Sequence, residues 1–333
     1  MTIRPPFAAA IATGAAALPA LGCRGEQAVL APHGPEAEGI ATLALVLFAG
    51  GTAILLAVVV LTAMAVWRSP ERRRWLADER LVVWGGVIVP AVVLTATLVY
   101  GLSLTDERDD PGRPAAATIE VVGERWWWRV RYLAPDGSVD VETANEIRLP
   151  VGRPVVLRLL TADVIHSLWV PNLAGKLDMT PGHVNHLRVE ASTPGVFRGQ
   201  CAEYCGGEHA WMAFHVVAQP PADFARWLAR ARQPAAAPAD PFAADGERLF
   251  LATGCGSCHA VRGTPARGVV GPDLSLVGQR RALAAGRLPN NRGTLIAWTA
   301  SADHLKPDNG MPSFAFLSGT ELRALAAYME GLR

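Results

Sequence analysis

Two long uncharged runs constrain this chain more than any other feature of its sequence. Residues 40–67 and 81–105 contain no Asp, Glu, Lys or Arg. Each run is longer than the ~20 apolar residues that an α-helix needs to cross the hydrocarbon core of a bilayer. A pair of helices buried in a soluble core is the alternative, but two uncharged runs of this length are rare in soluble proteins. We therefore predict two transmembrane helices, at residues 40–67 and 81–105, that form a hairpin.

The segment between the two runs predicts their orientation. It is rich in arginine, whereas the outer flanks carry mainly Glu and Asp; the arginines are Arg68, Arg72, Arg73, Arg74 and Arg80. Loops that stay in the cytoplasm are enriched in Lys and Arg. Both termini, and all residues after 105, are therefore predicted to lie outside the cytoplasm.

The first 23 residues have the pattern of a secretory signal peptide. Arg4 precedes an apolar, Ala-rich run from Phe7 to Gly22, which is too short to cross a bilayer comfortably. Residues 20–23 resemble a bacterial lipobox, which predicts lipidation of Cys23. Ordinary cleavage near Cys23, or an uncleaved tail, is the alternative. These features indicate a multi-pass protein of a bacterial inner (cell) membrane, with its soluble part on the periplasmic or outer side.

Composition excludes two broad classes. The chain of 333 residues is 50% hydrophobic and 18% charged, with 31 Lys and Arg against 30 Asp and Glu. Apolar content this high excludes a disordered protein, and the balanced charge argues against nucleic acid as a partner. The length outside the membrane segments is sufficient for two small domains.

Residues 115–220 are predicted to form an all-β domain. Short β-rich runs alternate there with Gly, Pro and Asp turns, at 118–122, 126–132, 145–149, 154–160, 186–189 and 214–217. This spacing is typical of a sandwich or barrel.

The remaining residues are predicted to be a connection and a helical domain. Residues 221–241 comprise a short amphipathic helix (221–232) and a Pro/Ala linker (233–241). Residues 242–333 have helical patterns at 243–253, 292–301 and 318–331, and so small a segment would need a cofactor to complete its core.

The first group of candidate ligands lies on one predicted loop. Cys201, Cys205, His209 and Met212 have the spacing Cys-x3-Cys-x3-His-x2-Met. Thiolate, imidazole and thioether ligands together favour copper in an electron-transfer site. One thiolate would make a mononuclear blue-copper site, whereas two thiolates on one loop can bridge two copper ions. A zinc site is the alternative for two Cys and two His, but the methionine and the spacing disfavour it.

Two bridged copper ions would need a second imidazole from elsewhere in the chain. His166 is the candidate, because it ends a β-rich stretch, as the upstream histidine of a cupredoxin sandwich would. His183, His186 and His215 are also available, but their contexts are more typical of exposed or core-edge strand positions.

The second group of candidate ligands is an attachment motif for a c-type haem. Cys255, Cys258 and His259 form C-x-x-C-H, in which the thiols bind the haem covalently and the histidine is an axial ligand. Met311, in a downstream loop, is the candidate for the sixth ligand, since methionine raises the reduction potential. Met329, in the last predicted helix, and His304 are the alternatives. A thioredoxin-like redox pair is disfavoured because no βαβ pattern surrounds the motif.

The hairpin, the β-domain and the copper motif, over residues 39–217, resemble subunit II of haem–copper terminal oxidases with its binuclear copper A centre. The resemblance implies six copper ligands, five side chains and the backbone carbonyl of Glu203: His166, Cys201, Cys205, His209, Met212 and Glu203. It also implies that the Glu203 carboxylate reaches a magnesium ion at the interface with subunit I.

The resemblance assigns a role to one tryptophan and leaves one glutamate without a role. Trp126 is the implied electron-input residue, in a run of three tryptophans where a strand would point Trp126 and Trp128 to the same side. A membrane-interface belt or simple core contacts are the alternative for this run. The family often has a proton-path glutamate before the second span, but Glu79 lies at a different spacing, so this role is not carried over.

Residues 242–333 resemble a class I cytochrome c, including Gly271-Pro272-Asp273-Leu274 after the haem motif. The fused arrangement resembles subunit II of caa-type oxidases. It predicts a multidomain membrane protein with a two-helix transmembrane hairpin, an all-β cupredoxin-like sandwich and an all-α class I cytochrome c domain.

The resemblance implies an electron-transfer subunit in a larger enzyme. Electrons would pass from haem c through copper A to the haem and copper B centre of subunit I, where oxygen is reduced. The implied partners are subunits I and III, the lipid bilayer, and an upstream cytochrome complex or soluble cytochrome c as donor. Three alternatives remain: the small subunit of a copper-A nitric oxide reductase, a free-standing membrane-tethered shuttle, and a copper-storage or chaperone protein. The haem argues against storage, and the two-span hairpin argues against the shuttle.

Charge predicts that the two soluble domains attract each other. Residues 115–220 contain 9 Lys and Arg against 11 Asp and Glu, a net charge of −2, and residues 243–333 contain 10 against 7, a net charge of +3. Opposite charges favour docking of the cytochrome on the copper domain. The linker would reach about 28 Å if it extended by ~3.1 Å per residue.

The predicted orientation can be tested with a reporter. An enzyme that is active only outside the cytoplasm, fused after Arg333, should be active, because the arginine-rich loop keeps residues 68–80 inside. The matched control is the same reporter inserted in that loop, which should be inactive. Activity of the loop fusion and silence of the terminal fusion would reverse the topology.

Overall fold

A computed structural model describes residues 25–106 and 114–333, so the predicted signal peptide and Cys23 lie outside the described residues. The chain divides into two compact units, one of residues 38–113 and one of residues 1–37 and 114–333. The first unit holds most of the two apolar helices, and the second holds the soluble domains. Each unit is described by itself.

Among the residues that the structure describes, two helical segments are long and apolar enough to cross a membrane. Helix α2 (Pro35–Trp67) begins five residues before the predicted start, and its candidate span has a mean hydropathy of 2.7. The second span, from Glu79 to Ser103, has a mean hydropathy of 2.2. It comprises α4 (Glu79–Val83), a π-helical turn η2 (Trp84–Ile88) and most of α5 (Val89–Asp106). Both segments thus have the length and composition of membrane spans.

Two features are related to the start of α2 and to the π-helical turn in the second span. Glu36 and Glu38 lie in the first turns of α2, where negative charge is favourable at a helix N-terminus. Pro90 lacks a backbone N–H, and a wider π-helical turn immediately before it is a common accommodation of such a disruption. The arginine-rich segment between the spans forms the short helices α3 (Pro70–Arg73) and η1 (Arg74–Ala77).

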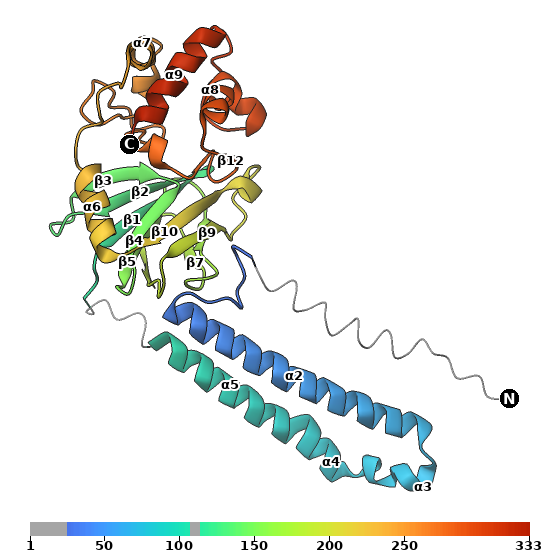
Figure 1. Ribbon diagram of the computed structural model, residues 1–333. Helices are drawn as coiled ribbons and strands as arrows, with labels where there is room; N and C mark the ends of the chain where they lie inside the picture. Colours follow the sequence, from blue (N-terminus) through green and yellow to red (C-terminus); the bar gives the residue numbers. More distant parts are fainter. Residues whose placement is uncertain (1–24, 107–113) are drawn as a thin grey trace. The chain divides into compact units, whose positions relative to one another are not determined.

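The β-domain is a sandwich of two five-stranded sheets (Figure 1). One sheet has the order β3-β2-β1-β5-β8, and its strands are β3 (Val139–Ala144), β2 (Trp127–Leu133), β1 (Thr118–Glu124), β5 (Val155–Thr161) and β8 (Asn185–Val189). The other has the order β4-β10-β9-β6-β7, and its strands are β4 (Glu146–Pro150), β10 (Ala213–Gln219), β9 (Gly195–Cys201), β6 (His166–Trp169) and β7 (Leu177–Met179). Neighbouring strands run antiparallel except β1 with β5 and β4 with β10.

Alternating side chains from the two sheets fill the core of the sandwich. Trp128 of β2 and Phe214 of β10 are fully buried, and their ring centroids lie 5.1 Å apart in an edge-on arrangement. Gly199 makes this possible, because a Cβ there would lie 2.2 Å from the ring of Phe214. Helix α6 (Pro221–Ala231) closes one end by burying Phe224 and Trp227. The all-β sandwich predicted from the sequence is confirmed, although β3, β6, β7 and β9 were not among the predicted strands.

The C-terminal domain is helical and is built around the crossing of its first and last helices. Its main elements are α7 (Pro241–Ala252), α8 (Arg292–Leu305) and α9 (Gly319–Gly331) (Figure 1). Where α7 and α9 meet, Gly246 lies so close to α9 that a Cβ would be 2.1 Å from the carbonyl oxygen of Ala324. Phe250 and Tyr328 continue the contact, with ring centroids 5.6 Å apart.

The segment predicted as a free Pro/Ala linker lies on the C-terminal domain instead. The backbone N–H of Ala235 donates to the carbonyl of Arg262 at 2.9 Å. Gly263 has positive φ, and a Cβ there would meet Pro234 at 2.5 Å. The segment is therefore not a free tether that extends by ~3.1 Å per residue to about 28 Å. The sequence could not show this, since the partners of the segment are residues of a loop further along the chain.

The α7–α9 crossing generates a stability prediction. Gly246→Ala should lower the free energy of unfolding of the C-terminal domain by about 1–3 kcal/mol, because the added methyl group overlaps the backbone of α9. The matched control is Gly331→Ala at the end of α9, where no described atom lies within 4 Å of the added Cβ. Denaturant unfolding followed by circular dichroism measures both. Equal stability of the two variants would contradict the close crossing.

Candidate functional site

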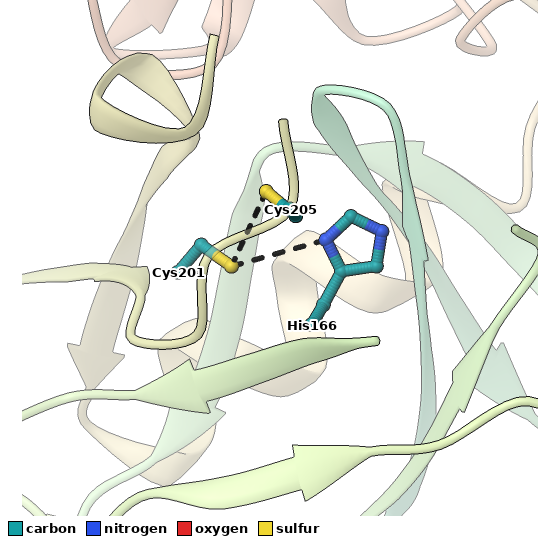
Figure 2. A group of neighbouring side chains, drawn as sticks. All are labelled: His166, Cys201 and Cys205. Carbon is teal, nitrogen blue, oxygen red and sulfur yellow. Dashed lines mark hydrogen bonds between the residues drawn. The ribbon is translucent and has the colours of Figure 1, made fainter. Parts of the chain in front are cut away.

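The metal-ligand candidates meet because two short strands pair. β6 begins at His166, β9 ends at Cys201, and Leu168 of β6 pairs with Cys201. The chain then loops back to β10 and closes the loop with a hydrogen bond of 2.8 Å from Cys201 N–H to the carbonyl of Met212. Dashed lines in Figure 2 join the Cys201 sulfur to the sulfur of Cys205 and to a ring nitrogen of His166. Both distances are 3.8 Å.

The other predicted ligands lie against the same two sulfurs. On one side, the carbonyl oxygen of Glu203 is 3.2 Å from Cys201 Sγ. On the other side, His209 Nδ1 is 3.5 Å and Met212 Sδ is 3.8 Å from Cys205 Sγ. The structure thus brings together all six groups that the sequence placed in one centre.

The donor set fits a soft transition metal. Donor atoms held ~2.3 Å from a tetrahedral ion lie about 3.8 Å apart, which matches the spacing of these atoms. Thiolate, imidazole and thioether donors favour copper. Among the His, Cys, Asp and Glu side chains that the structure describes, one group has three or more mutually close donor atoms. It consists of His166, Cys201 and Cys205. His183 and His186 are exposed, and His215 is half-buried on β10, outside this group.

Asp163 orients the imidazole of His166. Its carboxylate lies 2.8 Å from His166 Nε2, so that Nδ1 faces the sulfur of Cys201. Burial opposes ionisation of Asp163, but hydrogen bonds from His166 and from the backbone N–H groups of Val164 and Arg125 lower its pKa below the ordinary value. The hydrogen bond from Cys205, assisted by His166, likewise lowers the pKa of Cys201 and favours the thiolate that binds metal.

The side chain of Glu203 points away from the sulfur cluster into solvent. Its carboxylate is 44% exposed and lies 4.0 Å from the ammonium of Lys176, which is also largely exposed. The implied role of this carboxylate as a magnesium ligand therefore stays a prediction.

The haem-ligand candidates line a cavity of about 540 Å³, a volume in the usual range for cofactor sites. Cys255, Cys258, His259 and Met311 all lie on its wall. The Nδ1 of His259 is 2.8 Å from the carbonyl oxygen of Pro272, which leaves Nε2 for a metal. Burial lowers the pKa of His259 and favours the neutral, ligating form.

A buried arginine shows that the cavity suits an anionic cofactor. Arg280 lines the cavity, and its Nε has no hydrogen-bond partner among the described residues. Burial lowers its pKa to about 10, so the guanidinium is charged at neutral pH. The carboxylates of a haem would supply a partner for this Nε, while another nitrogen of the guanidinium donates to the carbonyl of Asp273. Of the alternative axial ligands, Met329 also lies on the wall, whereas His304 is exposed and outside the lining.

The cavity is shared with the β-domain through a tryptophan. Trp126 lies on its wall and is only 8% exposed, and its indole N–H donates to the carbonyl oxygen of Cys205 at 3.0 Å. The prediction that Trp126 belongs to a strand is wrong: β2 begins at Trp127, and Trp126 lies in the turn that precedes it. This turn allows one side chain to reach both the haem cavity and the copper-ligand loop.

Five hydrogen bonds around this tryptophan join the two domains and end on backbone carbonyl oxygens. Lys306 Nζ donates to Trp126 O and Trp211 O, at 2.7 and 2.9 Å. In the other three, the side chain of Arg129 donates to Val269 O at 2.9 Å, the backbone N–H of Ala213 donates to Ala285 O at 2.9 Å, and the side chain of Arg198 donates to Gly286 O at 3.3 Å.

Sequence analysis did not identify Lys306, Arg280 or Asp163 as functional residues. Nothing in their local patterns marks them, apart from the fact that Lys306 is one of only two lysines in the chain.

Comparisons with known proteins identify the families of both soluble domains. Residues 132–219 match the family model described as cytochrome c oxidase subunit II, periplasmic domain, and residues 243–333 match that of cytochrome c. Cytochrome c oxidase subunit 2 of Alkalihalophilus pseudofirmus is 32% identical over 330 residues, which cover 94% of this chain and 93% of the relative. The protein of the same name from Bacillus subtilis is 30% identical and covers 74% of this chain and 72% of the relative.

A solved structure, the periplasmic domain of cytochrome oxidase subunit II from Bradyrhizobium japonicum, is also similar. It is 30% identical, covers 36% of this chain and 96% of its own, and has a TM-score of 0.34.

The fold and the two ligand clusters define a membrane-anchored electron-transfer protein with a cupredoxin-like domain and a cytochrome c domain. The chain belongs to the cytochrome c oxidase subunit II family and is part of a haem–copper terminal oxidase. Its cytochrome c domain is consistent with the caa type. The relationship predicted from the sequence is confirmed.

Proposed function

We propose that this chain is the electron-input subunit of its oxidase, in which each electron passes from haem c to a binuclear copper A centre and on to subunit I. The observation that carries the proposal is the position of Trp126. Its side chain lies on the wall of the haem cavity, and its N–H donates to the carbonyl of Cys205, a candidate copper ligand. The step moves one electron and needs no bond or proton transfer.

Six groups would hold the copper centre. They are the thiolates of Cys201 and Cys205, the imidazoles of His166 and His209, the thioether of Met212 and the carbonyl oxygen of Glu203. When bound, the copper pair supplies a one-electron acceptor. Cys201 and Cys205 are both buried, and so are His166 and Met212, which excludes water from the centre. By the same proposal, the exposed carboxylate of Glu203 holds magnesium at the interface with subunit I.

The C-terminal domain would hold the haem with four side chains. Cys255 and Cys258 would form the thioethers, and His259 and Met311 would be the axial ligands. When bound, the haem supplies the one-electron donor. Met311 is favoured over Met329 because its loop is anchored by Asn309, whose side-chain oxygen accepts from the Met311 N–H at 2.9 Å.

The cellular setting follows from the sequence and the family. We place both soluble domains on the periplasmic or outer side, with both apolar helices crossing the membrane, because of the arginine-rich loop. Subunits I and III of the oxidase would be partners, and a soluble cytochrome c or an upstream cytochrome complex would be the donor. The relatives are named cytochrome c oxidase, which favours oxygen over nitric oxide as the final acceptor.

The binuclear assignment can be tested with Cys205→Ser. The change removes one bridging thiolate, so the purified subunit should bind at most one copper and lose the mixed-valence near-infrared band, while its haem is retained. Tyr204→Phe, an exposed neighbour on the same loop, is the matched control and should keep both signals. Metal analysis and near-infrared spectra give the result. Two coppers with an intact band in Cys205→Ser would refute the assignment.

The proposed electron path can be tested with Trp126→Phe in the intact oxidase. Loss of the hydrogen bond from the indole N–H to Cys205 should slow electron transfer from haem to copper by about tenfold, because this bond orients the ring between the haem cavity and the copper-ligand loop. Rapid mixing with a reductant, followed at the haem and copper bands, measures the rate. Trp227→Phe, on the helix that covers the end of the sandwich, is the control.

The rate of haem-to-copper transfer in the unmodified protein should depend only weakly on salt concentration, because the contacts between the domains are short and partly buried. A steep salt dependence, or copper that is reduced while the haem stays oxidised, would contradict the path.

A further inference from the structure

Lys306 is a buried cation at the junction of the two soluble domains. It is 3% exposed, and its ammonium donates to three backbone carbonyl oxygens: Trp126 at 2.7 Å, Trp211 at 2.9 Å and Ala284 at 3.4 Å. A lysine ammonium has three donors and no acceptor. Three segments that are far apart in the sequence therefore satisfy every donor of this one group.

The two acceptors in the β-domain belong to the segments that matter for electron transfer. Trp126 links the haem cavity to the copper-ligand loop, and Trp211 immediately precedes the ligand candidate Met212. The C-terminal domain holds this second segment at two further points. Ala213 N–H donates to Ala285 O at 2.9 Å, and the guanidinium of Arg287 lies over the Trp211 ring, 2.9 Å from its centroid.

On its other side, Lys306 fixes the start of the loop that carries Met311. Its backbone N–H ends helix α8 by donating to Ala302 O at 2.9 Å. Its carbonyl oxygen accepts from the Asn309 side chain at 2.6 Å, and the same side chain accepts from Met311 N–H at 2.9 Å. One side chain therefore separates the backbone of Lys306 from that of the proposed axial ligand.

A carboxylate of the copper-ligand loop favours the charged form of Lys306, whereas the guanidinium of Arg287 disfavours it. Burial lowers its pKa to about 8, and the carboxylate of Glu208 opposes this shift. Glu208 is itself buried, and one of its oxygens has no hydrogen-bond partner among the described residues. A charged donor makes shorter and stronger hydrogen bonds than a neutral one, so an ammonium is well suited to hold the two domains in one arrangement.

We propose that Lys306 is the positioning residue for electron transfer between the domains, because its ammonium locks the Met311 loop against the carbonyls of Trp126 and Trp211. It thereby sets the separation of haem and copper without touching either centre. The inference rests on the proposed function for its kinetic consequence only. The lock itself is a statement about contacts between two parts of this chain.

The test uses the intact oxidase and two substitutions of Lys306. Lys306→Met keeps the length of the side chain and removes all donors and the charge, and Lys306→Gln keeps an amide donor if the first variant does not fold. Asp303→Asn, an exposed change of the same charge magnitude on α8, is the matched control. Hydrogen exchange by mass spectrometry reports on the contact, and rapid mixing reports on electron transfer. Absorption spectra and reduction potentials of the haem and copper centres are measured as well, to show whether either centre is itself altered.

The lock predicts a local effect. In the Lys306 variants, exchange should rise in peptides that cover residues 209–213 and 284–287, while α7 and α9 stay protected. Haem-to-copper transfer should slow by about tenfold, with both spectra and potentials unchanged, as expected for a lost orientation. The control should match the unmodified protein.

Unchanged exchange at residues 209–213 would overturn the lock, whatever the kinetics show. Changed potentials, or exchange that rises throughout the C-terminal domain, would overturn it in favour of a tuning or folding role. If the unmodified oxidase shows no haem-to-copper transfer, the proposed function fails, and exchange alone still decides whether Lys306 joins the domains.

Discussion

The pairing of β6 with β9 is the constraint on which the copper site depends. It places His166 beside Cys201, although 34 residues separate them in the sequence. Because the loop after Cys201 must return to β10 next to the same strand, Cys205, His209 and Met212 are drawn to the same point. Asp163, just before β6, orients the ring of His166 through a contact of 2.8 Å between its carboxylate and Nε2.

Much of this could be predicted because the decisive signals are local. The uncharged runs, the C-x-x-C-H motif and the Cys-x3-Cys-x3-His-x2-Met loop each lie within one short stretch, and chemistry restricts what such stretches can do. Three of the four missed strands have a visible reason in their sequence. β6 and β7 have four and three residues, too few for an alternating pattern, and β9 contains two glycines, which usually disfavour a strand. Gly199 is required there because Phe214 occupies the space of its side chain.

The residues that escaped sequence analysis act across long distances in the chain. Trp126 could be named from the resemblance, but its function depends on a turn that a strand pattern does not reveal. Arg280 becomes significant only because the fold buries it on the wall of the haem cavity. Lys306 has no motif, and its three acceptors belong to segments of both domains. Such contacts are set by tertiary structure, and no local pattern encodes them.

Charge complementarity between the domains is present, but it works differently from a simple attraction of opposite surfaces. The sequence predicts a basic cytochrome domain on an acidic copper domain. In the structure, the carboxylates Glu146 and Glu208 do lie near Arg280 and Lys306, yet the hydrogen bonds of these cations end mainly on backbone carbonyls. Backbone acceptors are fixed by the fold, so they define an orientation, whereas pairs of flexible charged side chains permit many. A soluble donor must release its partner after each electron, but a fused domain has no such requirement. A buried, directional contact is therefore the physically appropriate junction for a cytochrome that stays with its acceptor.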